Sequence, residues 1–199
     1  TEVRRLLDDA GLAQILINTP AGAPASRTAS GAAFVPGARQ EFRDGVLRAL
    51  EYATALDARV VHVMAGIKPA DADADAAFAT YVANISWAAE QARGTGVRLA
   101  LEAINKRDQP GYGLASMETA AAVAQAVDPD AVGVLFDVYH AQVDRGNVIE
   151  RFERLLPLIA HVQIADNPGR GEPGTGEIAY ERVLAGIAKS GYAGWIGCE

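Results

Sequence analysis

The sequence predicts an α/β fold, a (β/α)8 TIM barrel that appears incomplete, with six of eight strands present. Segments with the apolar pattern of strands alternate with segments whose apolar residues have helical spacing, which is typical of parallel strands joined by right-handed crossovers. A doubly wound sheet would share this alternation. Polar side chains end several strands rather than one pair, and this distribution favours the barrel.

The first half of the chain begins with a helical pattern. Val3, Leu6 and Leu7 have helical spacing with charged residues between them, and Gly11 ends this helix. The Pro- and Gly-containing loop at 19–37 is long for a compact domain, which favours a functional role. The expected elements are a helix ending at 11, a strand over 12–18, a helix ending near 56, a strand over 59–65 and a helix ending near 94.

The second half continues the alternation. The Ala-rich run from Met117 to Val127 is helical, and the run Asp166 to Gly169 stops a strand with strong turn-forming residues. The expected elements are a strand over 97–104, a polar loop over 105–112, a helix over 117–127, a strand over 132–137, one helix carrying Val148 to Leu156, a strand over 161–165, a helix around 183–187 and a strand over 195–199.

The chain is expected to be one domain over residues 1–199. A complete barrel takes roughly 250 residues, whereas this sequence begins in a helix and ends on a strand. The expectation is therefore a single barrel domain that lacks its N-terminal strand–helix–strand and its closing C-terminal helix.

Composition limits the classes of partner. The formal net charge is −7 and the pI is near 5.0, which argues against nucleic acid because duplex binding depends on Lys and Arg. Cys198 is the single cysteine, so no intrachain disulfide is expected and a cytoplasmic setting is favoured. No apolar run reaches the roughly 18 residues of a membrane span. The expected partner is a small molecule, and a homo-oligomer stays possible.

Four strands end in oxygen-bearing side chains: Glu102, Asp137, Gln163 and Glu199. Alternation along each strand allows all four to point into the barrel while their apolar neighbours face the helices. Crowded carboxylates repel and raise each other's pKa, and a divalent cation removes that conflict. An all-oxygen set favours Mg²⁺ or Mn²⁺. The alternative is that each side chain bonds separately to loop amides.

Long motifs around these positions resemble the hydroxypyruvate isomerases, a family of the sugar isomerase/epimerase barrels that is related in fold to xylose isomerase. The motifs lie at 101–112, 136–140, 161–177 and 194–199. The resemblance implies that Glu102, Asp137, Gln163 and Glu199 ligate the metal, with Glu102 and Glu199 as the acid/base pair. It also implies interconversion of hydroxypyruvate and 2-hydroxy-3-oxopropanoate (tartronate semialdehyde) through an enediolate.

Five further residues are candidates for substrate binding. His140 resembles a substrate-binding histidine of the group, and Arg170 suits a carboxylate or hydroxyl, with Glu172 as a residue that orients it. His62 is expected to face the barrel interior, and Lys106 is a candidate for substrate charge. For each residue the alternative is a structural or solvated role.

Other functions remain open at this stage. A 2-oxo-tetronate isomerase or a ketose 3-epimerase would use the same carboxylates. A DNA-repair enzyme like the type IV endonucleases would need a histidine-rich zinc site, which three histidines and the negative charge do not favour. A non-catalytic binding barrel is the remaining alternative.

Overall fold

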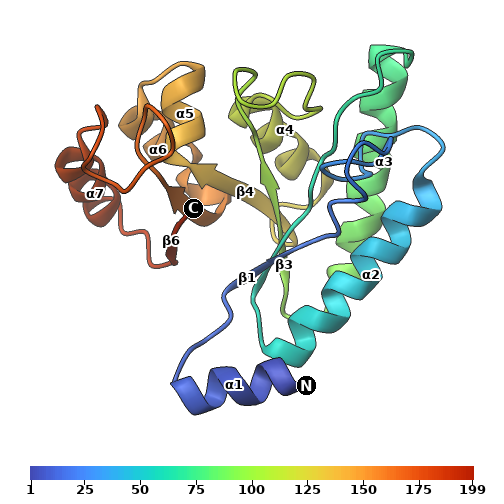
Figure 1. The fold of residues 1–199 in the computed structure, drawn as a ribbon, viewed down its shortest axis with the longest axis horizontal. Helices are drawn as coiled ribbons and strands as arrows, with labels where there is room; N and C mark the ends of the chain where they lie inside the picture. The colour runs from blue at the N-terminus through green and yellow to red at the C-terminus, as the bar shows by residue number, and fades with distance from the viewer.

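The computed structural model describes residues 1–199 and contains one sheet of six parallel strands in the order β1-β2-β3-β4-β5-β6. The strands form an open half-barrel with helices packed along its outer side (Figure 1), which confirms the predicted fold class. The strands are β1 (Leu16–Asn18), β2 (Val60–His62), β3 (Arg98–Glu102), β4 (Val132–Asp137), β5 (Ile159–Ile164) and β6 (Ile196–Cys198). The expectation of a single domain over 1–199 stays a prediction.

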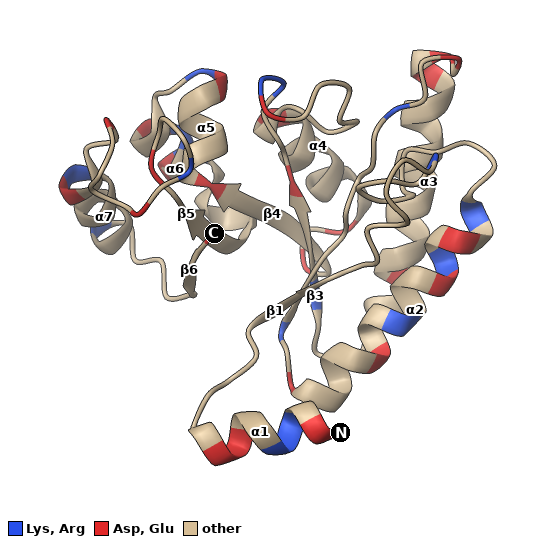
Figure 2. Ribbon diagram, viewed as in Figure 1, with Lys and Arg blue, Asp and Glu red and all other residues tan.

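Helices follow the strands as the alternation predicted. They are α1 (Glu2–Ala10), α2 (Arg39–Leu56), α3 (Ala74–Ala92), α4 (Met117–Val127), α5 (Val138–Asp144), α6 (Val148–Leu155) and α7 (Tyr180–Lys189), with a 3₁₀ turn at Leu156–Leu158. None of them is both long and apolar enough to cross a membrane. Acidic and basic residues follow one another along α2, whereas most residues of the strands are uncharged (Figure 2).

Several details differ from the sequence prediction. The strands expected over 59–65, 97–104 and 195–199 are shorter, at Val60–His62, Arg98–Glu102 and Ile196–Cys198. The connection from β4 to β5 contains two helices instead of one, because Gly146 and Asn147 both adopt positive φ, 64° and 50°, and interrupt the helical path. The first strand covers only Leu16–Asn18, the residues that pair with Val60–His62, rather than 12–18.

The loop over 19–37 packs against the barrel rather than standing free. Phe34 is buried and its ring stacks on that of Tyr81 with 4.2 Å between centroids. The backbone N–H of Phe34 donates to the carbonyl of Ala65. Gly31 has a φ of 117°, and a Cβ there would lie 2.2 Å from the carbonyl oxygen of Met64, so only glycine permits this approach.

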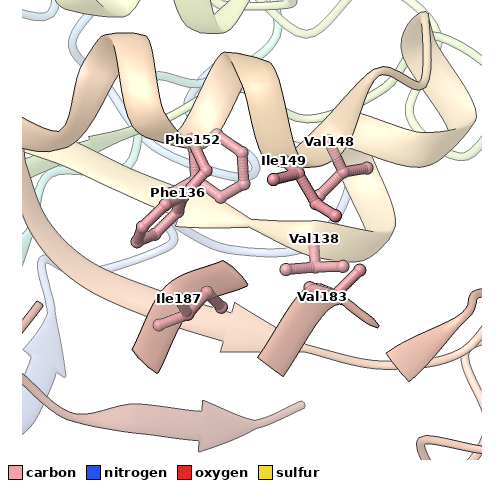
Figure 3. A pocket seen from close by; sticks show the side chains of 7 residues that line it. All are labelled: Phe136, Val138, Val148, Ile149, Phe152, Val183 and Ile187. Atoms are coloured by element: carbon pink, nitrogen blue, oxygen red, sulfur yellow. The ribbon is translucent and has the colours of Figure 1, made fainter. Parts of the chain in front are cut away.

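The main core lies between the sheet and its helices, where 44 buried apolar residues form one cluster. The end of this core near α6 and α7 is lined only by apolar side chains (Figure 3). Phe136 and Phe152 meet edge to face there, with 5.3 Å between ring centroids. The lining residues are Phe136, Val138, Val148, Ile149, Phe152, Val183 and Ile187.

Shortening one of these side chains should cost stability without affecting the strand ends. Ile187→Val removes one buried methylene, and we expect the free energy of unfolding to fall by about 0.5–1.5 kcal/mol. Urea denaturation at constant cation concentration measures this change. The exposed Leu184 on the same helix is the matched control: a Leu184→Val variant that loses as much stability would contradict the assignment.

Candidate active site

Parallel register brings the predicted ligands to one edge of the sheet. Glu102 ends β3 beside Leu135, and Asp137 ends β4 directly beside Gln163 of β5. Glu102 and Asp137 are buried, with 4% and 0% of their surfaces exposed. Glu199 follows β6 and its side chain is 49% exposed. The carboxyl ends of the strands therefore hold an acidic cluster of Glu102, Asp137 and Glu199. Glu102 and Asp137 are buried, whereas Glu199 is exposed to solvent.

Three of these side chains contain a buried oxygen without a hydrogen-bond partner. The atoms are Oε1 of Glu102, Oδ2 of Asp137 and Oε1 of Gln163. A buried acceptor that lacks a donor is costly, so such atoms are rare in folded proteins. Three of them on neighbouring strands fit the requirements of a cation that takes oxygen ligands.

The raised pKa values of the buried carboxyl groups also favour a bound cation. Burial raises the pKa of Glu102 well above its ordinary value, and the neighbouring carboxylates Asp137 and Glu199 add to this effect, with Arg170 opposing it. Burial raises the pKa of Asp137 to about 7, although the backbone N–H of His140 donates to its Oδ1 at 2.8 Å. Uncompensated negative charge is therefore unfavourable at this edge of the sheet.

These shifts predict a pH-dependent stability for the cation-free protein. Asp137 has a raised pKa when folded, so the stability associated with its protonated form is present below the ordinary carboxyl range and is lost as the pH rises through about 7. The raised pKa of Glu102 acts in the same direction. His62 and His140 act in the opposite direction, because their folded pKa values of about 4 lie below 6.5. Their contribution is lost as the pH falls below 6.5.

The test compares the wild type with Asp137→Asn, because histidines of the unfolded state titrate around pH 6.5 in both proteins and their contribution cancels in the comparison. Between pH 6.5 and about pH 8, we expect the melting temperature of the chelator-treated wild type to fall relative to that of chelator-treated Asp137→Asn. Calorimetry at several pH values measures both slopes. Equal slopes for the two proteins would contradict the raised pKa of Asp137.

His140 lies in the first turn of α5, and its ring faces the acidic cluster. Its Nε2 is 3.9 Å from Oε1 of Glu102, and its Nδ1 is 2.7 Å from Nδ2 of Asn105. The side-chain oxygen of Asn105 accepts from the backbone N–H of Asp108, so the nitrogen of the amide must face the ring. Burial, together with the positive charge of Arg170, lowers the pKa of His140 to about 4. The neutral ring thus accepts at Nδ1 and carries its hydrogen on Nε2.

His62 also lies in the cluster, as expected. It is buried, and its Nε2 is 3.4 Å from Oε2 of Glu102, although the geometry is not that of a hydrogen bond. Burial and the nearby His161 lower its pKa to about 4, so the ring is neutral at pH 7.

Arg170 reaches the open side of the cluster. Its Nη2 is 3.4 Å from Oε1 of Glu199, and its guanidinium lies 5.3 Å from the centre of the Tyr139 ring. The expected pair between Arg170 and Glu172 is not formed, because Glu172 points to solvent and makes no ion pair, and Glu199 occupies that position. Lys106 is exposed and lines a separate groove of about 830 Å³ beside α3 and α4.

A hydrogen-bond network that sequence reasoning missed supports the cluster from the loops. Tyr139 donates its O–H to Oδ2 of Asp108 at 2.6 Å, and the same oxygen accepts from Asn105 at 3.1 Å. Arg107 donates to the Tyr139 hydroxyl at 2.9 Å and to Oδ1 of Asn167 at 3.0 Å. The network joins the loop after β3 to the loop after β5. Its only sequence signal was the concentration of polar residues in 105–112.

One carboxylate organises the loop after β5, which carries Arg170. Asp166 accepts from the backbone N–H groups of Asn167, Gly174 and Ile178 at 2.8, 2.7 and 3.1 Å. Although burial works against it, these bonds hold the pKa of Asp166 below its ordinary value. The loop therefore has a defined shape around a single anion.

Glu102, Asp137 and His140 form a compact, buried group that could hold a metal ion. One potential ligand atom from each lies within 4.8 Å of the others. Because Nε2 of His140 carries the hydrogen, this nitrogen faces the cluster as a hydrogen-bond donor and has no free lone pair for a metal. The oxygens of Glu102, Asp137 and Gln163 are therefore the better metal ligands.

Comparisons with known proteins agree with this geometry. The family described as xylose isomerase-like TIM barrel matches residues 1–199. The 2-oxo-tetronate isomerase of Cupriavidus necator is 41% identical over 198 residues, which cover 100% of this chain and 76% of that protein. The hydroxypyruvate isomerase of Escherichia coli is 37% identical over the same shares. The crystal structure described as AP endonuclease, family 2, from Brucella melitensis superposes with a TM-score of 0.93 at 37% identity, covering 99% of this chain and 76% of that one.

Proposed function

Because the chain belongs to the xylose isomerase-like TIM barrel family and is an isomerase, we propose that it interconverts a short 2-oxo-3-hydroxy acid and its 2-hydroxy-aldehyde isomer. The first candidate substrate is hydroxypyruvate, which would give 2-hydroxy-3-oxopropanoate. The observation that carries the proposal is the set of three unpartnered buried oxygens at one edge of the sheet. A carbonyl group can migrate along such an acid only if the negative charge of an enediolate is stabilised, and these oxygens would hold a cation that supplies this stabilisation.

We propose that Glu102, Asp137, Gln163 and Glu199 hold a divalent cation, Mg²⁺ or Mn²⁺. The orphaned oxygens of the first three fit such an ion, and Glu199 adds a carboxylate from the open side. A bound cation would supply Lewis-acid stabilisation of negative charge on the substrate oxygens. The oxygen-rich donor set favours a hard cation over zinc.

The protein's own groups would move the proton. In the proposed reaction one carboxylate removes a proton from the hydroxyl-bearing carbon, and a second carboxyl group delivers a proton to the adjacent carbon. The hydroxyl proton passes to the former carbonyl oxygen, so the substrate gains and loses no proton overall and the two carboxyl groups exchange protonation states. Glu102 and Glu199 are the proposed pair.

The remaining groups would bind and orient the substrate. The Nε2–H of His140 faces the cluster and can donate to a substrate oxygen. Arg170 is already paired with a carboxylate, that of Glu199, and can pair with the carboxylate of an acid substrate in the same way. Glu172 and Lys106 are proposed for substrate contact only through movement of their loops, since Glu172 is exposed and Lys106 lines the groove beside α3 and α4.

A second candidate function is 2-oxo-tetronate isomerisation, favoured by the 41% identity with the Cupriavidus necator protein. The two substrates share the reacting carbons and the carboxylate and differ in one additional hydroxymethylene group. Comparing kcat/KM for hydroxypyruvate and 2-oxo-tetronate, with and without chelator, decides between them. Inversion at C3 without migration of the carbonyl group would instead identify a 3-epimerase and overturn the proposal.

A further inference from the structure

We propose that Asn105 is a positioning residue that fixes the tautomer of His140, and that Asp108 holds Asn105 in the required orientation. The proposal extends the proposed function to a residue outside the reacting cluster. It rests on that function for its kinetic readout only.

The direction of every hydrogen bond around Asn105 is determined by its partners. The backbone N–H of Asp108 can only donate, and it lies 2.9 Å from Oδ1 of Asn105. The carboxylate of Asp108 can only accept, and its Oδ2 lies 3.1 Å from Nδ2 of Asn105. Asp108 thus binds both ends of the Asn105 amide, the oxygen through its backbone N–H and the nitrogen through its carboxylate. A flipped amide would place two acceptors together and two donors together.

The second hydrogen on Nδ2 of Asn105 then points at the ring. Nδ2 lies 2.7 Å from Nδ1 of His140, and the backbone N–H of Asn105 lies 3.4 Å from the same nitrogen. Because Nδ1 faces two donors, it cannot carry a hydrogen itself. The hydrogen is therefore on Nε2, the nitrogen that faces Glu102.

Tyr139 holds Asp108 in place from the other side. Its hydroxyl donates to the same oxygen of Asp108 that accepts from Asn105. The hydroxyl oxygen of Tyr139 in turn accepts from Arg107. Asn105 is buried, whereas the side chain of Asp108 is 26% exposed, so the network runs from the surface to the cluster.

The inference predicts that an acid in place of the amide reverses the tautomer. In Asn105→Asp a carboxylate faces Nδ1 of His140, which must then carry a hydrogen. Repulsion from Asp108 complicates this variant. In the double variant Asn105→Asp/Asp108→Asn the amide and the acid exchange places, so a carboxylate still faces the ring and the two side chains can still bond to each other.

Long-range ¹H–¹⁵N NMR at neutral pH reads the tautomer directly. The signals of His140 are assigned by their loss in His140→Gln. We expect an unprotonated Nδ1 in the wild type and in Tyr139→Phe, which leaves both bonds between Asn105 and Asp108 intact. We expect a protonated Nδ1 in Asn105→Asp and in the double variant.

The kinetic readout separates positioning from stability. We expect the double variant to lose about 10- to 100-fold in kcat/KM, as is typical when a partner that orients an active-site histidine is changed. Asp128→Asn is the control. Asp128 forms an ion pair with Arg93 at the opposite end of the strands, so this variant removes a paired carboxylate far from the cluster. The activity of Asp128→Asn should be unchanged.

Two results would overturn the inference: an unprotonated Nδ1 in both acid variants, or a reversed tautomer with full activity. If the wild-type protein does not isomerise hydroxy-oxo acids, the proposed function fails, but the NMR comparison still decides whether Asn105 sets the tautomer.

Discussion

Replacing Glu102 by glutamine is expected to lower kcat by about 10²- to 10⁴-fold, the range over which a positioned proton-transfer group contributes. The amide has nearly the shape of the carboxylate but can neither accept nor deliver the proton. Glu102 is buried and already carries an unpartnered oxygen, so the loss should appear in kcat rather than through unfolding. Initial rates with hydroxypyruvate and 2-oxo-tetronate at saturating cation measure this effect.

The same substitution should stabilise the cation-free protein. Burial makes the charged form of Glu102 unfavourable, and a neutral amide removes that cost. We therefore expect Glu102→Gln to melt at a higher temperature than the wild type in chelator above neutral pH. Glu90→Gln on the exposed face of α3 is the matched control and should change neither property. An active Glu102→Gln enzyme would remove Glu102 from the proposed acid/base pair.

Removing divalent cations is expected to abolish turnover, and adding Mg²⁺ or Mn²⁺ should restore it. Binding to the folded state alone also raises stability, by about 2.7 kcal/mol when the cation is at 100 times its dissociation constant. We expect this rise in melting temperature in the wild type and its loss in Asp137→Asn, because Asp137 provides one of the three unpartnered oxygens.

The size of the rise should depend on pH. Asp137 has a pKa of about 7, so a proton competes with the cation below that value and the stabilisation should grow as the pH rises through it. Asp128→Asn, which changes a carboxylate far from the cluster, should keep the full cation response. Turnover that persists in chelator, with no cation-dependent change in melting, would contradict the proposed metal site.

The part of the site built on strands could be predicted from the sequence, and the part built on loops could not. Glu102, Asp137 and Gln163 end neighbouring parallel strands, so alternation along each strand was enough to place them together. The contact between Asn105 and His140 depends on the path of the loop after β3, which no local pattern encodes. For the same reason the sequence paired Arg170 with Glu172, a neighbour in the chain, rather than with Glu199.

The extent of the helices was set by local backbone conformation. The apolar pattern indicated one helix after β4, carrying Val148 to Leu156, which corresponds to α6. The sequence missed α5, which the positive φ angles at Gly146 and Asn147 separate from α6. Helical spacing of apolar residues shows which residues face the core. Both α5 and α6 bury their apolar residues, so the spacing alone does not show where one helix ends and the next begins.

The way in which Asp166 holds its loop has an evolutionary consequence. The carboxylate binds backbone groups at both ends of the segment, at Asn167 and at Gly174 and Ile178, and so requires little of the side chains between them. Within residues 168–173, exposed side chains such as Arg170 can therefore diversify among descendants while the scaffold stays intact, whereas Gly169, with a φ of 91°, is held to glycine. A lineage could acquire a new substrate preference through a few exchanges in this hexapeptide, provided that the aspartate is inherited.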